Sequence, residues 1–145
     1  MLSWLAGKMI GRAMKAMREG DMGPTVALYA EDVKFRFPGE NSFAPGADGK
    51  AALEEWLRRF IRLGLQIYPD EVALSGWPWK QKISVRGHVH LDDPQDGRVY
   101  ENRYVIWGHM RWGKMREYEV YEDTERTTAL DAWLERRGKE AQPAA

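Results

Sequence analysis

The chain has 145 residues, a length that normally forms one domain with its own hydrophobic core. Its 22 basic and 22 acidic residues balance, and the sequence pI near 6.8 argues against nucleic acid or an anionic membrane as a partner. The sequence contains no cysteine, which excludes disulfide bonds, thiolate metal sites and a cysteine nucleophile and is compatible with the cytoplasm.

The apolar start of the chain, residues 1–10, lacks the basic head and the small-residue cleavage site of a secretion signal. No stretch approaches the roughly 18 uncharged apolar residues that a membrane-spanning helix needs. We therefore expect a cytoplasmic protein without a membrane partner. Seven tryptophans, six tyrosines and four phenylalanines are a heavy aromatic content, and we expect some of them to line a cavity.

Two helices and a strand are predicted first along the chain. Apolar residues recur every three or four positions from Leu2 to Met17 and predict an amphipathic helix that ends near Gly20. Pro24 suits the first turn of a short second helix, and the alternation of apolar and basic residues over 33–37 predicts a strand.

A loop over residues 38–49 separates this strand from a third helix. Asp48 can cap the helix, and Gly64 can end it. Its wide apolar face includes Leu53, Trp56, Leu57 and Phe60.

Strands dominate the second half of the chain, over about residues 70–76, 80–91, 98–112 and 115–122. Their short links require antiparallel pairing. A last helix follows, capped by Asp123 or Thr124, and the tail over residues 139–145 is predicted to be disordered.

This order of elements predicts an α+β fold in a single domain over residues 1–138. We expect the curved antiparallel sheet to wrap around the N-terminal helices as a cone with one apolar pocket.

The last hairpin determines which side chains share a face of the sheet. Two turns fit the sequence, Trp112-Gly113 and Gly113-Lys114, and both give the same faces, because a shift of two residues leaves every side chain on its side. One predicted face carries Arg103, Val105, Trp107, His109, Arg116, Tyr118, Val120 and Glu122; the other carries Tyr104, Ile106, Met110, Glu117, Glu119 and Tyr121. Because both faces mix apolar and polar groups, we expect one to line the pocket and the other to form a homodimer.

Three segments together resemble the SnoaL-like branch of the nuclear-transport-factor-2-like superfamily, and the resemblance covers nearly the whole chain. The first segment runs over residues 18–39, from Arg18-Glu19-Gly20-Asp21 to Pro38-Gly39, the second over 49–60, and the third over 113–124, ending in Tyr121-Glu122-Asp123-Thr124. The resemblance implies a cone-shaped fold with a deep apolar cavity, commonly a homodimer and usually without a metal. It implies no single activity, since members include isomerases, epoxide hydrolases, polyketide cyclases and proteins that only bind.

The catalytic residues that the resemblance implies for the isomerases and for the epoxide hydrolases are absent from this chain. Where the isomerases carry a general-base aspartate, this sequence has Phe37, and their oxyanion-hole tyrosine falls at Ala13. The catalytic aspartate of the epoxide hydrolases falls at Val120.

Glu122 is our candidate for a catalytic carboxylate, because an apolar cavity would raise its pKa towards neutrality. We take His109 as its proton partner, with Arg103 or Tyr118 stabilising negative charge. In the alternative interpretation, Glu122 forms a structural ion pair with Arg103 across the hairpin.

His88 and His90 point the same way from one strand, with Asp92 next on that side, a pattern that can hold a divalent metal. A solvent or dimer face explains them better, and we expect no metal. Function is thus predicted as the binding of a small hydrophobic molecule, with a cofactor-independent isomerase, cyclase or hydrolase reaction, or as a non-catalytic binding or dimerisation module. The expected ligand-binding residues are Tyr29, Phe37, Trp56, Phe60, Trp107, Tyr118 and Val120.

Overall fold

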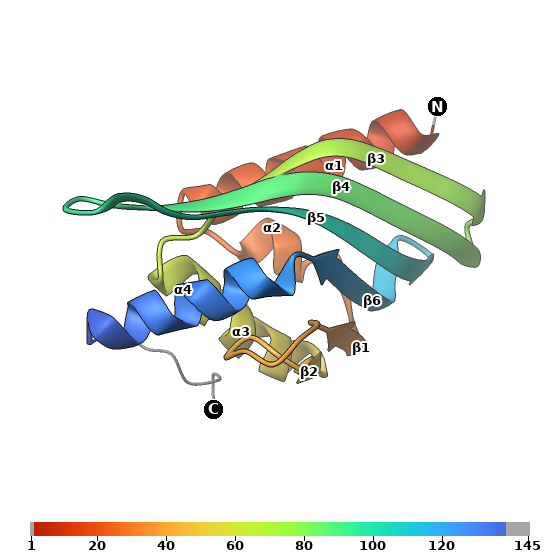
Figure 1. The fold of residues 1–145 in the computed structure, drawn as a ribbon. Coiled ribbons are helices and arrows are strands. Elements are labelled where there is room, and N and C mark those ends of the chain that lie inside the picture. Colours follow the sequence, from red (N-terminus) through yellow and green to blue (C-terminus); the bar gives the residue numbers. More distant parts are fainter. Residues whose placement is uncertain (1, 139–145) are drawn as a thin grey trace.

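A six-stranded curved sheet forms the body of the protein in a computed structural model that describes residues 2–138 (Figure 1). The tail predicted to be disordered lies outside the described residues. The strands are β1 (Tyr29–Arg36), β2 (Gly46–Asp48), β3 (Gln66–Trp77), β4 (Lys80–Asp93), β5 (Gly97–Arg111) and β6 (Lys114–Glu122). The helices are α1 (Leu2–Arg18), α2 (Gly23–Val26), α3 (Lys50–Arg62) and α4 (Thr124–Arg136).

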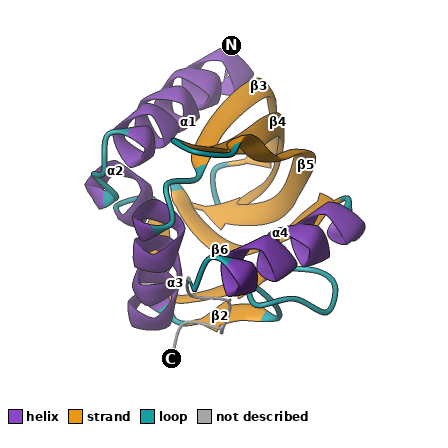
Figure 2. Cartoon of the chain, turned by 60° about the vertical axis from the view of Figure 1, so that its left-hand side comes forward, coloured by secondary structure: helices purple, strands orange, loops and turns teal. Residues whose placement is uncertain are grey.

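The strands lie side by side in the order β2-β1-β6-β5-β4-β3. Consecutive strands from β3 to β6 pair antiparallel, as their short links predict. β1 joins the far side of β6 as a parallel neighbour, a pairing that sequence reasoning did not anticipate. The α+β class with N-terminal helices and a curved sheet is confirmed, and Figure 2 shows the helices around the hollow of the sheet.

Helix α1 packs along β3 through its buried alanine and methionine side chains. Ser3 exchanges two hydrogen bonds with the backbone of Leu74, and the Arg18 guanidinium donates to the carbonyl oxygen of Ile67 at 2.7 Å. These contacts anchor both ends of the helix to one strand. Within residues 2–138, no helix combines the length and apolarity needed to cross a bilayer.

The two helix caps that the sequence suggested have different outcomes. Asp123 caps α4, since its carboxylate accepts a hydrogen bond from the backbone N–H of Glu125 at 3.1 Å. The Asp48 cap is wrong: Gly49 occupies the cap position of α3, and Asp48 ends β2. Its carboxylate instead pairs with Arg36 on β1 at 2.7 Å.

A β-bulge at Arg116 changes which residues of β5 share a face of the sheet with Tyr118, Val120 and Glu122 of β6. The tight turn is Trp112-Gly113, where both residues have positive φ, as the two-residue turn favoured between antiparallel strands requires. Met110 pairs with Met115 but His109 pairs with Glu117, so that Arg116 is the extra residue. A regular hairpin from this turn would place Arg103 opposite Glu122, whereas the bulge places Tyr104 there.

The bulge gives the sheet an inner and an outer face that differ in polarity. Buried or partly buried residues of the hairpin now alternate on the inner face, including Tyr104, Ile106, Tyr118, Val120 and Glu122. The predicted grouping of Arg103, Trp107 and His109 with these residues is therefore wrong. All three lie on the outer face, where Trp107 is 43% exposed.

A close approach between strands fixes the position of Tyr104. Gly87 on β4 pairs with Tyr104, whose hydroxyl donates to the carbonyl oxygen of Tyr68 at 2.8 Å across the glycine. A Cβ atom at Gly87 would lie 2.1 Å from that carbonyl oxygen and 2.4 Å from the tyrosine hydroxyl. Only glycine leaves room for this contact.

We predict that Gly87→Ala lowers the free energy of unfolding by about 2 kcal/mol, because the new methyl group displaces Tyr104 and breaks its hydrogen bond. Gly11→Ala is the matched control, since a Cβ atom there contacts nothing within 4 Å. In the middle of α1 it should raise stability by about 0.5–1 kcal/mol. Urea unfolding followed by circular dichroism measures both changes, and equal effects of the two substitutions would contradict the packing described for Gly87.

Candidate functional site

An apolar cavity of about 110 Å³ lies between the helices and the inner face of the sheet. Its volume is small beside the roughly 300–1,000 Å³ typical of sites for drug-sized ligands, and its lining is nearly all hydrophobic. The lining side chains include Met14, Met17, Tyr29, Phe35, Phe37, Trp56, Phe60, Tyr104, Ile106, Tyr118, Val120 and Glu122.

Aromatic rings in mutual contact form the wall on the α3 side. The Trp56 ring meets Phe35 edge-on at 4.7 Å between ring centres and stacks on Phe60 at 5.7 Å. The indole N–H of Trp56 donates to the carbonyl oxygen of Phe43 at 2.9 Å, which fixes the orientation of the ring. Such pairs add to the stability gained from burial alone, so the wall is held in place before any ligand enters.

Tyr29 and Tyr118 form a buried pair of hydroxyl groups at one part of this cavity. Their oxygens are 2.8 Å apart, and Tyr118 also stacks on Phe35 at 4.6 Å. Burial raises the pKa of Tyr29 to about 12 and that of Tyr118 well above its usual value. Both hydroxyls therefore keep their protons at neutral pH. Since one hydrogen bond joins the pair, one O–H is left that can donate to a ligand.

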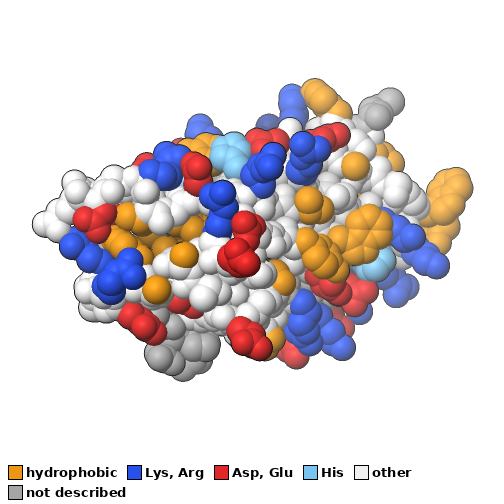
Figure 3. Space-filling model, in the orientation of Figure 1, with side chains coloured by type: hydrophobic (Ala, Val, Ile, Leu, Met, Phe, Trp, Pro, Cys, Tyr) orange, Lys and Arg blue, Asp and Glu red, His pale blue; other side chains and the backbone are white. Residues whose placement is uncertain are grey.

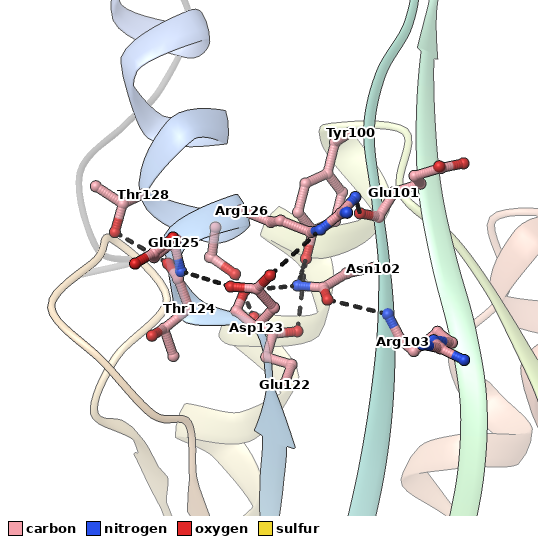
Figure 4. A network of polar contacts seen from close by, with 11 residues as sticks. Tyr100, Glu101, Asn102, Arg103, Glu122, Asp123, Thr124, Glu125, Arg126 and Thr128 are labelled. Atoms are coloured by element: carbon pink, nitrogen blue, oxygen red, sulfur yellow. Dashed lines mark hydrogen bonds and ion pairs between the residues drawn. The ribbon is translucent and has the colours of Figure 1, made fainter.

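Glu122 is the one carboxylic acid among the lining residues of the cavity. It ends β6, and Thr127 from the first turns of α4 donates its hydroxyl to one carboxylate oxygen. The hydroxyl of Tyr100 lies 3.5 Å from the other oxygen and receives a hydrogen bond from the Asn102 amide at 3.1 Å. Figure 4 shows Tyr100, Asn102 and Glu122 close together where β6 passes into α4.

Burial raises the pKa of Glu122 to about 7, because the surrounding protein cannot solvate a carboxylate as water does. The hydrogen bonds from Thr127 and Tyr100 lower this pKa, and the charge of Asp123 raises it, but desolvation is the largest effect. A carboxyl group with this pKa exchanges a proton readily near neutral pH, which is what general acid–base catalysis requires.

A second hollow, of about 570 Å³, meets the cavity at Glu122. Glu122 and Val89 line both, so the carboxyl group stands between an apolar interior and a charged outer cleft. The cleft is lined on its outer side by His88, His90, Arg98, Glu101, Arg103, Asp123 and Arg126. Two of its arginines form ion pairs: Arg98 with Asp92 at 2.6 Å, and Arg126 with Asp123 at 3.3 Å.

The structure brings seven of the sequence-predicted site residues together around the cavity: Tyr29, Phe37, Trp56, Phe60, Tyr118, Val120 and Glu122. It separates the other three from them. His109 lies 2.8 Å from Glu117 on the outer face, beside Trp107. Arg103 lines the outer cleft, and Figure 4 shows its side chain directed away from the Glu122 carboxylate. The alternative ion pair between Arg103 and Glu122 does not form within the described residues, because the bulge places Tyr104 opposite Glu122.

Sequence reasoning missed Tyr100, Asn102 and Thr127, the residues that surround the Glu122 carboxyl group. Tyr100 and Asn102 lie four and two residues before Tyr104, on the same face of β5. That face could be recognised as the one shared with Glu122 only if the bulge in β6 were known. Thr127 lies four residues after the Asp123 cap, in α4. It contacts Glu122 because of the direction in which α4 leaves the end of β6, which the sequence does not indicate.

The histidines considered as metal ligands have other partners. His88 lies 2.9 Å from Asp70 and stacks on Tyr68, and His90 lies 3.7 Å from Asp92. Across residues 2–138, no group of three or more histidine, aspartate or glutamate side chains is arranged to hold a metal ion. Both histidines lie on the outer face, as their alternation with buried residues of β4 indicates.

A family model described as the SnoaL-like domain matches residues 10–118, three quarters of the chain. The chain belongs to the SnoaL-like family. The match agrees with the resemblance found in the sequence, and it runs from the middle of α1 to the middle of β6. The fold of this family serves polyketide cyclases and ligand-binding proteins. No curated protein matches the sequence.

Solved structures share the fold at low sequence identity. PrhC from Penicillium brasilianum has a TM-score of 0.71 at 15% identity, over 90% of this chain and 88% of that one. A nuclear-transport-factor-2-like protein from Burkholderia xenovorans gives 0.62 at 24% identity, over 83% and 91%. SalBIII, an epoxide hydrolase/cyclase-like enzyme in pyran ring formation in the polyether salinomycin, gives 0.65 at 18% identity, over 87% and 97%. At these identities the structures establish the fold alone.

We predict that the Glu122 carboxyl carbon titrates near pH 7 in a ¹³C NMR experiment. Between the unfolded pKa of about 4.5 and this value, the folded chain keeps a proton that the unfolded chain loses, so stability falls as pH rises. Glu122→Gln should therefore gain stability relative to the native sequence between about pH 5 and about pH 8, by up to about 3 kcal/mol.

Glu119→Gln, on the outer face of the same strand, is the control and should leave the pH dependence unchanged. A Glu122 titration near its ordinary value would show that the carboxyl group is solvated.

Proposed function

We propose that this SnoaL-like protein binds a small hydrophobic molecule in the apolar cavity and moves a proton on it with Glu122. The observation that carries the proposal is a carboxyl group with a pKa of about 7 in the lining of an otherwise hydrophobic cavity. The reaction class is isomerisation, cyclisation or hydrolysis without a cofactor.

The ligand has to be small because the cavity is small. An engineered apolar cavity of about 150 Å³ accommodates benzene, and the volume here is about 110 Å³. A single ring is therefore the upper limit for the part of the ligand that this space can hold, and a carbonyl or hydroxyl group on that ring suits the polar groups of the lining. The uncharged part of the molecule would contact Trp56 and Phe60, and its polar group would reach Glu122 or the tyrosine pair.

Glu122 and the pair of Tyr29 and Tyr118 supply complementary roles. As a carboxylate, Glu122 removes a proton from the ligand, and the proton passes from the ligand carbon or oxygen to a carboxylate oxygen. Negative charge that develops on a carbonyl oxygen is then stabilised by the O–H that the tyrosine pair leaves available. Tyr118 and Glu122 point the same way from β6, on either side of Val120, so both groups face one molecule.

Proton transfer is measured as the exchange of α-hydrogens of a small cyclic ketone in D₂O, followed by ¹H NMR. We expect exchange above the uncatalysed rate that increases as pH rises through about 7, since the carboxylate form of Glu122 is the base. Glu122→Gln should lose at least about a hundredfold in this rate, whereas Glu119→Gln should keep it.

Thermal stabilisation by the same ketone tests binding separately. Stabilisation of both Glu122→Gln and the native sequence, without exchange by either, would favour the alternative of a non-catalytic ligand-binding module. If the ketone stabilised neither the native protein nor Glu122→Gln and neither protein exchanged its α-hydrogens, the proposed site would be contradicted.

We also propose that the protein forms a homodimer through the outer face of β5 and β6. Val105, Trp107 and Tyr121 are 38%, 43% and 53% exposed there, and Figure 3 shows hydrophobic side chains gathered over these strands. Because an isologous contact buries the same patch twice, two copies would cover it. We further propose that residues 1–138 form a single domain and that the protein acts in the cytoplasm. The absence of cysteine supports this location.

Light scattering after size exclusion should give twice the 16.8 kDa mass of one chain at micromolar concentration. Trp107→Arg should give the mass of one chain, because the charge cannot be buried in the contact. Trp112→Arg, at an exposed tryptophan of the β5–β6 turn, is the control and should remain a dimer. The mass of one chain for the native sequence would contradict the proposed dimer.

A further inference from the structure

Four of the seven tryptophans are exposed at one end of the molecule. Trp4 on α1, Trp77 and Trp79 at the β3–β4 turn, and Trp112 at the β5–β6 turn are 63%, 69%, 52% and 63% exposed. Figure 3 shows hydrophobic side chains projecting at the end of the molecule where the β3–β4 turn lies. Tryptophan is normally well buried, so four exposed rings in one region need an explanation.

The three turn tryptophans form a fixed cluster. Trp77 and Trp79 stack with 5.7 Å between ring centres, and Trp79 approaches Trp112 at 6.0 Å. The backbone N–H of Trp112 donates to the carbonyl oxygen of Pro78 at 2.7 Å, which joins the two turns. Since the rings contact one another while their outer surfaces remain in solvent, the cluster presents a preformed aromatic surface.

Aliphatic side chains of α1 extend this aromatic surface. A groove of about 300 Å³ runs between α1 and the two turns, lined by Leu2, Leu5, Met9, Leu74, Pro78 and Trp112. The first three of these side chains are 53%, 52% and 42% exposed. Two hydrogen bonds between Ser3 and the backbone of Leu74 hold the start of α1 against β3. The exposed apolar surface is therefore continuous and belongs to one rigid unit.

The ionisable residues in the segments that build this end of the molecule are all basic. Residues 2–12, 74–82 and 110–115, which build it, contain six lysine and arginine residues and no acidic residue. The chain as a whole has 22 of each sign, so its acidic residues are concentrated elsewhere. The balanced total that argued against an anionic partner thus conceals a local positive field. Lys8 lies over the Trp4 ring at 4.1 Å, which places a cation directly beside an exposed indole.

We propose that this end of the molecule, defined by Trp4, Trp77, Trp79, Trp112 and the groove beside α1, binds the surface of an anionic lipid bilayer. Indole rings favour the interface between headgroups and acyl chains. Lysine and arginine around them are attracted to anionic headgroups. The exposed leucine and methionine side chains of α1 gain from contact with hydrocarbon, which stacking on a nucleic acid would not provide. This binding is peripheral, because the apolar surface reaches only into the interface.

Vesicle co-sedimentation with the full chain tests the proposal. Vesicles of phosphatidylcholine containing phosphatidylglycerol should bind at least about tenfold more tightly than phosphatidylcholine alone, since several cations contribute. Binding should weaken as salt increases and should shift tryptophan emission to shorter wavelength. Trp77→Ala with Trp79→Ala should reduce binding by at least about tenfold. Both side chains are more than half exposed, so their removal leaves the core unchanged.

Two controls separate this surface from a general effect of aromatic or basic residues. Trp107→Ala removes an exposed tryptophan from the outer face of the sheet, and it should bind like the native chain when the two are compared at concentrations where light scattering gives them the same mass. Lys80→Glu with Arg111→Glu should lose binding to anionic vesicles, whereas Lys34→Glu with Arg136→Glu, the same charge change at other exposed positions, should retain it. Circular dichroism verifies that each variant is folded.

Equal binding to both kinds of vesicle, or no binding, would overturn the proposal. So would an equal loss for Trp107→Ala and for the double tryptophan variant. Tight binding of single-stranded DNA that the double tryptophan variant loses, without binding to vesicles, would assign the surface to nucleic acid. Self-association that the same variant abolishes, again without binding to vesicles, would assign it to a second copy of the chain.

Discussion

The β-bulge at Arg116 is the local feature on which the candidate site depends. Side chains of a strand alternate between faces, so one extra residue moves every later side chain of β6 to the opposite side of the sheet. With the bulge, Tyr118, Val120 and Glu122 face the cavity. Without it, Glu117, Glu119 and Tyr121 would be turned inward, and two acidic residues would enter the hydrophobic interior. The guanidinium of Arg116, which the bulge releases from regular pairing, contacts Asp32 on β1 at 3.1 Å.

The placement of Glu122 has an energetic cost that the rest of the structure offsets. Desolvation dominates the pKa of this carboxyl group, and the hydroxyls of Thr127 and Tyr100 recover only part of the lost hydration. The aromatic contacts of Trp56 with Phe35 and Phe60 and the close approach of Tyr104 to Gly87 stabilise the surrounding wall. A well-packed wall keeps water from the side of the carboxyl group that faces the cavity, and a partly desolvated carboxyl group is a better proton carrier near neutral pH.

Much of the fold was predictable because it rests on periodic patterns. The amphipathic spacing correctly predicts helix α1, and the strand alternation around Phe35 identifies the buried face of β1. The spacing is wrong about the first half of the helix, where Leu2, Leu5 and Met9 are exposed. The Asp123 cap was predictable from local chemistry alone. The parallel pairing of β1 with β6 was not, because it joins segments more than 80 residues apart and leaves no signal in either one.

Part of the candidate site was also predictable from periodic patterns in the sequence. Trp56 and Phe60 follow from helical spacing, and Tyr118 and Glu122 share a face of β6 in any register. Their neighbours across the hairpin depend on Arg116, an ordinary residue with no property that marks a bulge. Sequence reasoning therefore selected Arg103 and Trp107 in place of Tyr100 and Tyr104.

The most direct test of this account labels single cysteines in a chain that has none of its own. In a Trp107→Arg background, which removes the proposed dimer contact, Val120→Cys and Ile106→Cys should react slowly with a maleimide, whereas Glu119→Cys and Val105→Cys, one residue away on each strand, should react rapidly. Fast labelling at 120 with protection at 119, while 106 stays protected and 105 stays reactive, would mean that the bulge is absent and that Glu122 faces solvent.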